Sequence, residues 1–396
     1  MMRILQVGSI PSPSSYHEYV MSVELLRRGN KIMFMNPFKF NTSTLFMPKV
    51  KERDVHIVKD VEPETMRFLA LSKKLTKIEP PDIIYCHDFL HPERSITAKY
   101  VFKEFEKTRP ILTLDSHTFY FLEHSRLSSI KISVLKLLAR ELIEKAKLIY
   151  ATSSASSAVF KYLISKIYLP KEKVKRLELC VDTNMFSPKH KKHLMPLREK
   201  IGIPKDALVL ITVGGIRPYK RLELIIYAIS KLVKNESLTP KDITFIIVGD
   251  GSSYSNYLQK LSMDLGLLNK YVKFLGRVEW VRLPKYYAIS DLAIFTAPTV
   301  SILEALASGL PLLCYKYFPS KDYRYAHAGD VYCYHNNCFL FELTSEDIYL
   351  TLKSIINLSD KELKKIGYYS RKLAEKKYSC KVVVDQLIKD LSEVNE

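Results

Sequence analysis

The sequence has 396 residues, of which 47% are hydrophobic and 26% are charged, an ordinary balance for a globular protein. This length exceeds the usual size of one hydrophobic core, so we expect two domains. Six cysteines do not make a disulfide framework in a chain this long, and no uninterrupted apolar run is long enough to span a bilayer. The N-terminus lacks the charged, apolar and small-residue layout of a signal peptide, and we therefore expect a cytoplasmic protein.

The net charge of +19 is concentrated in the first half of the chain. Residues 1–200 contain 35 Lys and Arg against 21 Asp and Glu, and the remainder contains 26 against 21. Such an excess serves an anionic membrane surface, nucleic acid or simply solubility. No nucleic-acid-binding motif is present, so nucleic acid is the least favoured partner. The other two interpretations stay open, and the even spread of charges among acids favours solubility.

Strand-like and helix-like segments alternate through the first half, which predicts an α/β fold with a parallel sheet. We expect strands at 2–10, 31–38, 82–89, 111–117 and 147–153, and helices at 17–29 and 126–147. His87 and His117 each follow the apolar part of a strand, where open α/β sheets bind ligands. Each is either a ligand-binding side chain or a structural histidine with satisfied hydrogen bonds.

The same rhythm restarts after a Lys- and Pro-containing linker that ends near residue 204. Apolar strands run into glycine turns at 207–215 and 243–251, amphipathic helices follow, and 361–393 reads as a lysine-rich helical segment. We therefore expect one domain at 1–188 and a second at 205–375, with a cleft between them.

The segment VGGIRPYKR places Gly214 and Gly215 at a strand end and Arg217, Lys220 and Arg221 at the entry to a helix. Backbone N–H groups at a helix start attract anions, and the basic side chains add fixed positive charge. The segment is either a diphosphate cradle or an ordinary turn with solvated lysines. The second turn, Gly-Asp-Gly at 249–251, is common in α/β proteins and weak by itself.

Glu304 stands near the start of a helix after an apolar strand. It can accept hydrogen bonds from ribose or sugar hydroxyls, or it can stabilise the helix start. Its apolar neighbours predict burial, so the carboxylate needs a partner. Cys333, His335 and Cys338 lack the paired spacing of a zinc site, and we expect no metal there.

Together these segments resemble the family-4 retaining glycosyltransferases of the GT-B fold, over nearly the whole chain and most closely over 209–315. The resemblance implies two facing Rossmann-like domains, with 376–396 crossing back as a helix onto the first. It assigns catalysis to His117, Lys220 and Glu304, where Lys220 falls on the diphosphate-binding lysine and Glu304 on the ribose-binding glutamate. The implied donor-binding residues are Gly214, Gly215, Arg217, Lys220, Arg221, Gly249, Gly251, Arg277, Val278, Thr299, Val300, Ser301 and Glu304. The implied acceptor-binding residues are Ser14, Ser15, His87 and His117.

The chain departs from that family's pattern in three ways. Thr296 stands eight residues before Glu304, at the position of the family's first glutamate, and the loop 297–301 is about four residues shorter than in that family. The family's sugar-binding glutamate and its glycine-rich loop are therefore missing or replaced. Gly215 replaces the usual arginine, and Ser14 and Ser15 replace paired glycines. The resemblance further implies a nucleotide-sugar as co-substrate, a glycan or lipid-linked acceptor, and no cofactor or bound metal. The alternatives are a GT-B protein that binds the nucleotide-sugar without turnover and a membrane-surface adaptor that uses the basic first half of the chain.

The segment 125–147 reads as a basic amphipathic helix, with leucines at helical spacing and six Lys or Arg. Such a helix can lie on an anionic membrane, which predicts peripheral attachment at the inner face of the membrane. The same apolar stripe is also what a helix needs to pack on its own sheet.

Overall fold

The computed structural model describes residues 1–8, 16–35, 55–57, 78–89, 92–116, 137, 139–152, 169–189, 195–251, 253–297, 299–316, 333 and 336–394. The chain forms two compact units, the first made of Met1–Cys180 and Cys380–Glu396 and the second of Val181–Ser379. The first unit thus ends at Cys180, whereas we expected 188. The expected linker belongs in part to the second unit, where Met195–Lys200 form helix α7.

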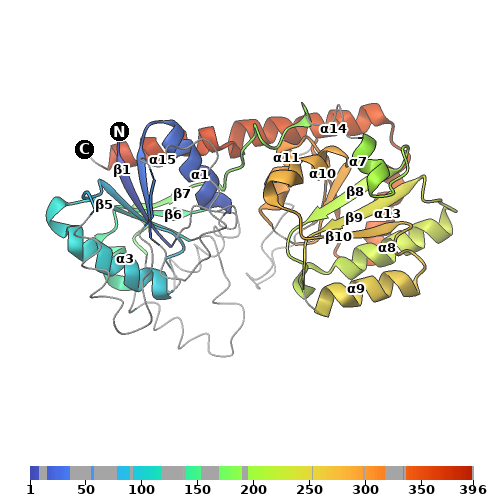
Figure 1. Ribbon diagram of the computed structural model, residues 1–396, viewed down its shortest axis with the longest axis horizontal. Coiled ribbons are helices and arrows are strands. Elements are labelled where there is room, and N and C mark those ends of the chain that lie inside the picture. The colour runs from blue at the N-terminus through green and yellow to red at the C-terminus, as the bar shows by residue number, and fades with distance from the viewer. Residues whose placement is uncertain are drawn as a thin grey trace. The chain divides into compact units, whose positions relative to one another are not determined.

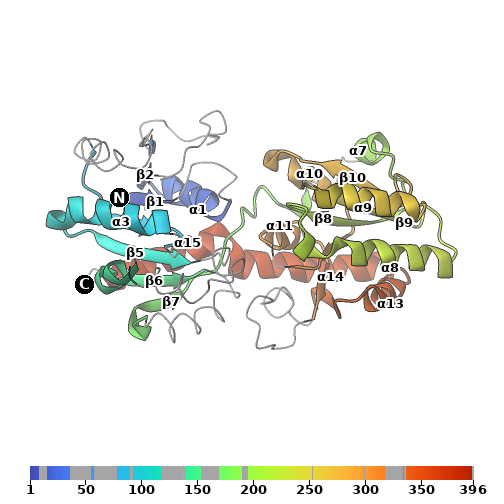
Figure 2. The same ribbon diagram turned by 90° about the horizontal axis from the view of Figure 1, so that it is seen from below.

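The first unit is built on a seven-stranded sheet in the order β3-β2-β1-β4-β5-β6-β7, and its strands pair in parallel. Figure 2 shows β5, β6 and β7 following one another across this sheet. The sequence of strands outward from β1 on both sides is that of a Rossmann fold. The elements are β1 (Arg3–Val7), α1 (Tyr16–Arg27), β2 (Lys31–Met35), β3 (Val55–Ile57), β4 (Ile83–Cys86), α3 (Pro92–Phe105), η4 (Glu106–Thr108), β5 (Ile111–Ser116), β6 (Leu148–Ala151), η5 (Lys171–Lys173), β7 (Val174–Arg176) and α15 (Cys380–Glu393).

Both faces of this sheet are covered, which explains why β1, β2, β4 and β6 are almost continuously apolar. Alternate strand residues such as Leu5, Ile84 and Leu112 pack in one cluster with α3 and with residues 139–146. The helix α15 packs against α1 (Figure 1). The end of the chain is therefore part of the first Rossmann-like unit.

A buried carboxylate fixes α15 in this unit. Asp390 is 2% exposed and accepts hydrogen bonds from Tyr150 Oη at 3.0 Å and Lys175 Nζ at 2.9 Å. A second, more exposed ion pair joins Arg28 to Asp385 at 2.6 Å. A buried carboxylate without these partners would be strongly unfavourable, so the contacts specify where the helix docks.

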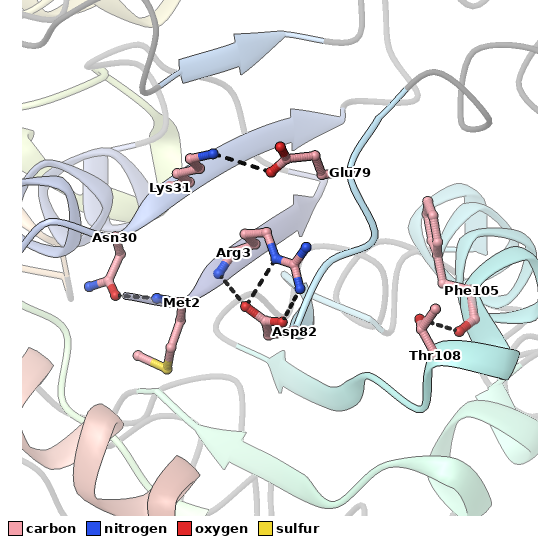
Figure 3. A network of polar contacts seen from close by, with 8 residues as sticks. All are labelled: Met2, Arg3, Asn30, Lys31, Glu79, Asp82, Phe105 and Thr108. Carbon is pink, nitrogen blue, oxygen red and sulfur yellow. Dashed lines mark hydrogen bonds and ion pairs between the residues drawn. The ribbon is translucent and has the colours of Figure 1, made fainter.

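Polar pairs close the amino edge of the same sheet, as Figure 3 shows. Arg3 donates to Asp82 through its backbone N–H at 2.8 Å and through Nη2 at 2.6 Å. The backbone N–H of Met2 is bonded to Asn30 Oδ1 at 3.0 Å. These residues tie β1, β2 and the approach to β4 together at the edge opposite to the carboxyl ends of the strands.

The second unit repeats the architecture with a parallel six-stranded sheet in the order β10-β9-β8-β11-β12-β13. Its helices α8 and α9 lie side by side (Figure 1). The prediction of an α/β chain with two Rossmann-like units is confirmed. The elements are α7 (Met195–Lys200), β8 (Leu208–Val213), η7 (Pro218–Lys220), α8 (Leu222–Asn235), β9 (Ile243–Val248), α9 (Ser253–Asp264), β10 (Val272–Gly276), η8 (Trp280–Arg282), α10 (Leu283–Ala288), β11 (Leu292–Phe295), α11 (Ser301–Ala307), β12 (Leu312–Tyr315), β13 (Cys338–Phe341), α13 (Ser345–Ile355), α14 (Asp360–Leu373) and the π-helical turn η10 (Ala374–Tyr378).

The expected single helical segment at 361–393 is divided in the structure. A capping box between Ser359 and Glu362 starts α14, which passes into η10. Ser379 then takes an extended conformation with ψ 141°, and α15 begins at Cys380. The break falls where the chain leaves the second unit for the first. Apolar periodicity alone could not locate it, because both parts are amphipathic.

Candidate functional site

The residues predicted to bind a donor gather at the carboxyl edge of the second sheet. The turn Gly214–Arg221 follows β8, the Gly249–Gly251 turn follows β9, and Thr296 and α11 follow β11. Strands β9, β8 and β11 are neighbours in the sheet. Their carboxyl ends therefore bring together segments about 30 and 80 residues apart in sequence, at the place where open α/β sheets bind ligands.

The two glycine turns cross at very short range. A methyl group on Gly249 would lie 2.0 Å from Gly214 O, and one on Gly251 would lie 2.0 Å from Ile216 O. Hydrogen bonds from Gly214 N to Val248 O and from Ile216 N to Asp250 O, both 2.9 Å, hold the turns together. Backbone crossing by itself thus requires glycine at 249 and 251, whether or not a ligand approaches them.

Lys220 lies beside the first glycine turn. A methyl group on Gly214 would be 2.9 Å from Lys220 Nζ, 3.6 Å from Thr299 Oγ1 and 3.7 Å from Ser301 Oγ. The ammonium forms no hydrogen bond or ion pair with any residue that the structure describes. Burial and, secondly, the positive charge of Arg217 lower the pKa of Lys220 from 10.5 to about 8. A desolvated cation beside hydroxyl groups and a glycine backbone is a site suited to an anion.

The two arginines of this turn differ in their surroundings. Arg217 is exposed and close enough to Lys220 to affect its pKa. Arg221 takes a left-handed conformation with φ 48° and pairs with Glu223 at 2.5 Å. Arg217 is therefore the better placed of the two to share an anion with Lys220. Gly215 is exposed, and its backbone is accessible at the same turn.

Glu304 is 3% exposed in the first turn of α11. Its Oε1 accepts a hydrogen bond from Trp280 Nε1 at 3.0 Å, and its Oε2 accepts one from Tyr287 Oη at 2.7 Å. Burial raises the pKa of Glu304 from 4.5 to about 7, although both hydrogen bonds oppose the rise. The partner that the sequence demanded for this carboxylate is thus found within the second unit.

The sequence analysis missed both partners of Glu304. Phe186 packs against Trp280 and Tyr287 with ring centroids 5.8 Å away in each case. Arg371 Nη1 donates to Phe186 O at 2.8 Å and to Ala307 O at 2.6 Å, which fixes this aromatic group to α11. The one available signal was that Trp280 is the only tryptophan of the chain.

The remaining residues predicted to bind the donor lie on two segments of the second unit. Arg277 is exposed and Val278 half-buried after β10, and Thr299, Val300 and Ser301 are half-buried at the start of α11.

In the first unit, His87 lies in the interior rather than at a surface. It is fully buried, its Nδ1 is 2.7 Å from Asp115 Oδ2, and Tyr85 stacks on its ring at 4.3 Å. Asp115 also accepts the backbone N–H of Asp88 at 2.7 Å. These contacts favour the structural interpretation of His87. Asp115 was overlooked because it stands within an apolar strand, which is itself an unusual place for an unpaired acid. Ser14, Ser15 and His117 lie outside the described residues.

The predicted basic amphipathic helix is described only at 137 and from 139 onward. Ala139, Leu142, Ile143 and Ala146 pack in the core of the first unit, whereas Leu137 is 77% exposed. This part of the apolar stripe thus serves packing. Within the described part of the chain, no helix is long and apolar enough to cross a membrane.

Elsewhere in the chain, the thiols of Cys333 and Cys338 are hydrogen-bonded to each other, and His335 lies outside the described residues.

The chain is thus a protein of two Rossmann-like units with a candidate anion-binding site at the edge of the second sheet. Comparison with known proteins narrows this class. Residues 196–373 match the family model "Glycosyl transferases group 1". A D-inositol 3-phosphate glycosyltransferase of Catenulispora acidiphila is 30% identical over 141 residues, which cover 34% of this chain and 32% of that protein. The sulfoquinovosyl transferase SQD2 of Arabidopsis thaliana is 29% identical over 164 residues, 40% of this chain and 29% of its own length. The matched segments thus span only about a third of these relatives.

Solved structures share the fold over the whole chain. Anabaena HepE, crystallised with UDP and glucose, is 20% identical with a TM-score of 0.73 and covers 99% of this chain and 100% of its own. Sucrose-phosphate synthase from Thermosynechococcus elongatus is 12% identical with a TM-score of 0.72 and covers 100% and 99%. The chain therefore has the GT-B fold, and its segment 196–373 is similar to group 1 glycosyltransferases.

Proposed function

We propose that this protein is a retaining, metal-independent glycosyltransferase that moves a sugar from a nucleotide-sugar donor to a glycan or lipid-linked acceptor. The observation that carries the proposal is the desolvated ammonium of Lys220, which lies beside Gly214, Thr299 and Ser301 without an acidic partner among the described residues. The family match over 196–373 and the UDP-glucose complex of HepE, a protein of the same fold, support a nucleotide-sugar as the anion.

In the proposed reaction, the bond from the anomeric carbon to the diphosphate breaks and a bond to the acceptor oxygen forms. Lys220 and Arg217 stabilise the negative charge that develops on the leaving diphosphate, the role that a metal ion would otherwise fill. The acceptor proton passes to the leaving phosphate, so no acidic nucleophile and no cofactor is needed. His117 contacts the transferred sugar or the acceptor, as the family resemblance implies.

Glu304 accepts a hydrogen bond from a hydroxyl group of the donor, on the ribose. A carboxylate has about four acceptor positions, and Trp280 and Tyr287 take two of those on Glu304. The hydroxyl would therefore join or replace the indole N–H on Oε1. Since Trp280 is the only tryptophan, its fluorescence would report donor binding at this carboxylate.

The experiment is a thermal-shift panel of nucleotide-sugars followed by a transfer assay with the stabilising donor. A ligand that binds only the folded state raises the melting temperature by mass action. Lys220→Met should abolish the shift and reduce turnover by about two to three orders of magnitude. Lys260→Met is the matched control, because this lysine is exposed in α9 of the same unit. A panel without any stabilising nucleotide-sugar would refute the proposal.

A protein that binds the donor without turnover is the second candidate, and Thr296 at the position of the family's first glutamate favours it. The two candidates differ in one outcome: donor-dependent stabilisation accompanied by neither hydrolysis nor transfer would select the second.

We further propose that the acceptor is lipid-linked and that the first unit docks on the inner face of an anionic membrane from the cytoplasm. The first unit, residues 1–180 and 380–396, contains 32 Lys and Arg against 23 Asp and Glu, a net charge of +9. This charge and the 77% exposed Leu137 support the proposal. Co-sedimentation with liposomes should increase with anionic lipid and decrease with salt. Sedimentation that does not depend on the anionic lipid content, or no sedimentation with liposomes at low salt, would favour a soluble glycan acceptor.

A further inference from the structure

Thr296 contacts the turn that carries Lys220. It follows directly after β11, is 3% exposed, and its hydroxyl donates a hydrogen bond to the backbone carbonyl of Lys220. This bond spans 76 residues of sequence and joins the end of a central strand to the anion-binding turn. The hydroxyl is thus committed to the backbone of the site rather than to the opening that a ligand would enter.

The turn needs such support because its backbone is strained. Arg221, the residue after Lys220, has φ 48°, which an arginine adopts only at an energetic cost. Two hydrogen bonds within the turn, from Lys220 N to Arg217 O and from Arg221 N to Pro218 O, both 3.0 Å, close it locally. Hydrogen bonds from Gly214 N and Ile216 N join the start of the turn to the end of β9, whereas the bond from Thr296 joins its Lys220 end to the end of β11. Together they set the direction in which the side chain of Lys220 leaves the backbone, toward Gly214.

The chemistry at position 296 is selective. A carbonyl oxygen can only accept a hydrogen bond, so its partner must be a donor, and a hydroxyl on a short side chain meets this requirement. A carboxylate could not donate to Lys220 O, and it would add negative charge beside the turn. Among the described residues, Arg217 is the one whose charge shifts the pKa of Lys220, and that charge is positive. A neutral donor at 296 therefore leaves the ammonium available for an anion from solution.

We propose that Thr296 is a positioning residue, whose hydrogen bond to the Lys220 carbonyl holds the Lys220 ammonium beside Gly214 for the diphosphate of the donor. The part that names the diphosphate rests on the proposed function, whereas the positioning of Lys220 does not. The residue that departs from the family's pattern thus has a definite function, because its hydrogen bond holds the backbone of Lys220 in place.

The first test needs no ligand. The rate at which Lys220 reacts with an amine-specific acylating reagent, followed by peptide mass spectrometry over pH 6.5 to 10.5, reports its pKa and exposure. We expect a midpoint near pH 8 in the unmutated protein. In Thr296→Val the midpoint should move toward 10.5 and the rate at pH 7.5 should change severalfold, because the turn is released. Thr296→Ser should restore the original profile.

Thr244→Val is the matched control. Thr244 is fully buried in strand β9 of the same sheet, and its hydroxyl has no hydrogen-bond partner among the described residues. The same isosteric change there should leave the Lys220 profile unaltered. An unchanged profile in a folded Thr296→Val protein would overturn the proposal, and so would an equal change in Thr244→Val.

The second test uses inorganic pyrophosphate in titration calorimetry and a double-mutant cycle with Lys220→Met. Thr296→Val should weaken pyrophosphate binding about tenfold in the unmutated background and leave it unchanged in the Lys220→Met background. Equal weakening in both backgrounds would show that Thr296 acts through general destabilisation and would refute its positioning role. If the unmutated protein binds neither pyrophosphate nor a nucleotide-sugar while the Lys220 profile still depends on Thr296, the proposed function fails and the positioning of Lys220 stands.

Discussion

Lys220→Met should stabilise the protein, in addition to removing donor binding. Folding lowers the pKa of Lys220 from 10.5 to about 8, so the folded state disfavours the charged form. One pKa unit corresponds to about 1.4 kcal/mol, which gives a penalty of up to about 3 kcal/mol at pH 7. Methionine fills a similar volume without charge and avoids this penalty. The melting temperature of the second unit should therefore rise at pH 7 by several degrees, up to about 10 °C.

The pH dependence gives this prediction its sign. Because the folded pKa lies below the unfolded one, the penalty is complete below pH 8 and disappears as the pH rises from about 8 to 10.5. Melting curves of Lys220→Met and of the unmutated protein should thus converge over that interval. Lys260→Met, the exposed control, should give no difference at any pH. A Lys220→Met protein that melts within a degree of the unmutated one at pH 7, with no convergence above pH 8, would show that the ammonium is solvated.

Three further predictions concern other elements. Because the pKa of Glu304 is about 7, Trp280 fluorescence should titrate with a midpoint near pH 7, and this transition should be absent in Glu304→Gln. The free energy of unfolding should fall relative to that variant as the pH rises from 4.5 through 7. A flat fluorescence profile would contradict this prediction. Gly249→Ala should destabilise the second unit by about 3 kcal/mol in urea unfolding, because the new Cβ would lie 2.0 Å from a carbonyl oxygen. Gly266→Ala, which has open space around it, should destabilise the unit by about 1 kcal/mol. Equal effects of the two substitutions would refute the backbone crossing. Asp390→Ala should lower the free energy of unfolding by about 2–4 kcal/mol and expose the amides of α15 to hydrogen exchange. Asp385→Ala, whose side chain is 55% exposed, should lower it by under about 1 kcal/mol. Similar losses in the two variants would mean that Asp390 does not anchor the helix.

The sequence by itself predicted the class of fold, because that class depends on local patterns. Apolar strands that end in glycine turns, such as 207–215 and 243–251, alternate with amphipathic helices, and this rhythm requires a parallel sheet covered on both faces. It also placed Lys220 and Glu304 at the carboxyl edge of the second sheet, since each lies in the first helical turn that follows a strand. Burial of Glu304 followed from its apolar neighbours.

The tertiary structure decided which groups those residues meet. Trp280 and Thr296 lie 24 and 76 residues from their partners Glu304 and Lys220, and no local pattern relates such positions. The same holds for His87, which the sequence could leave at a surface until Asp115, 28 residues away, was found against its ring. Side-chain partnership depends on strand order and on where each turn closes, whereas periodicity reports only the face on which a residue lies. For that reason the sequence predicted that the site lies at the carboxyl edge of the second sheet. Only the folded sheet showed that Thr296 is hydrogen-bonded there to the backbone of Lys220.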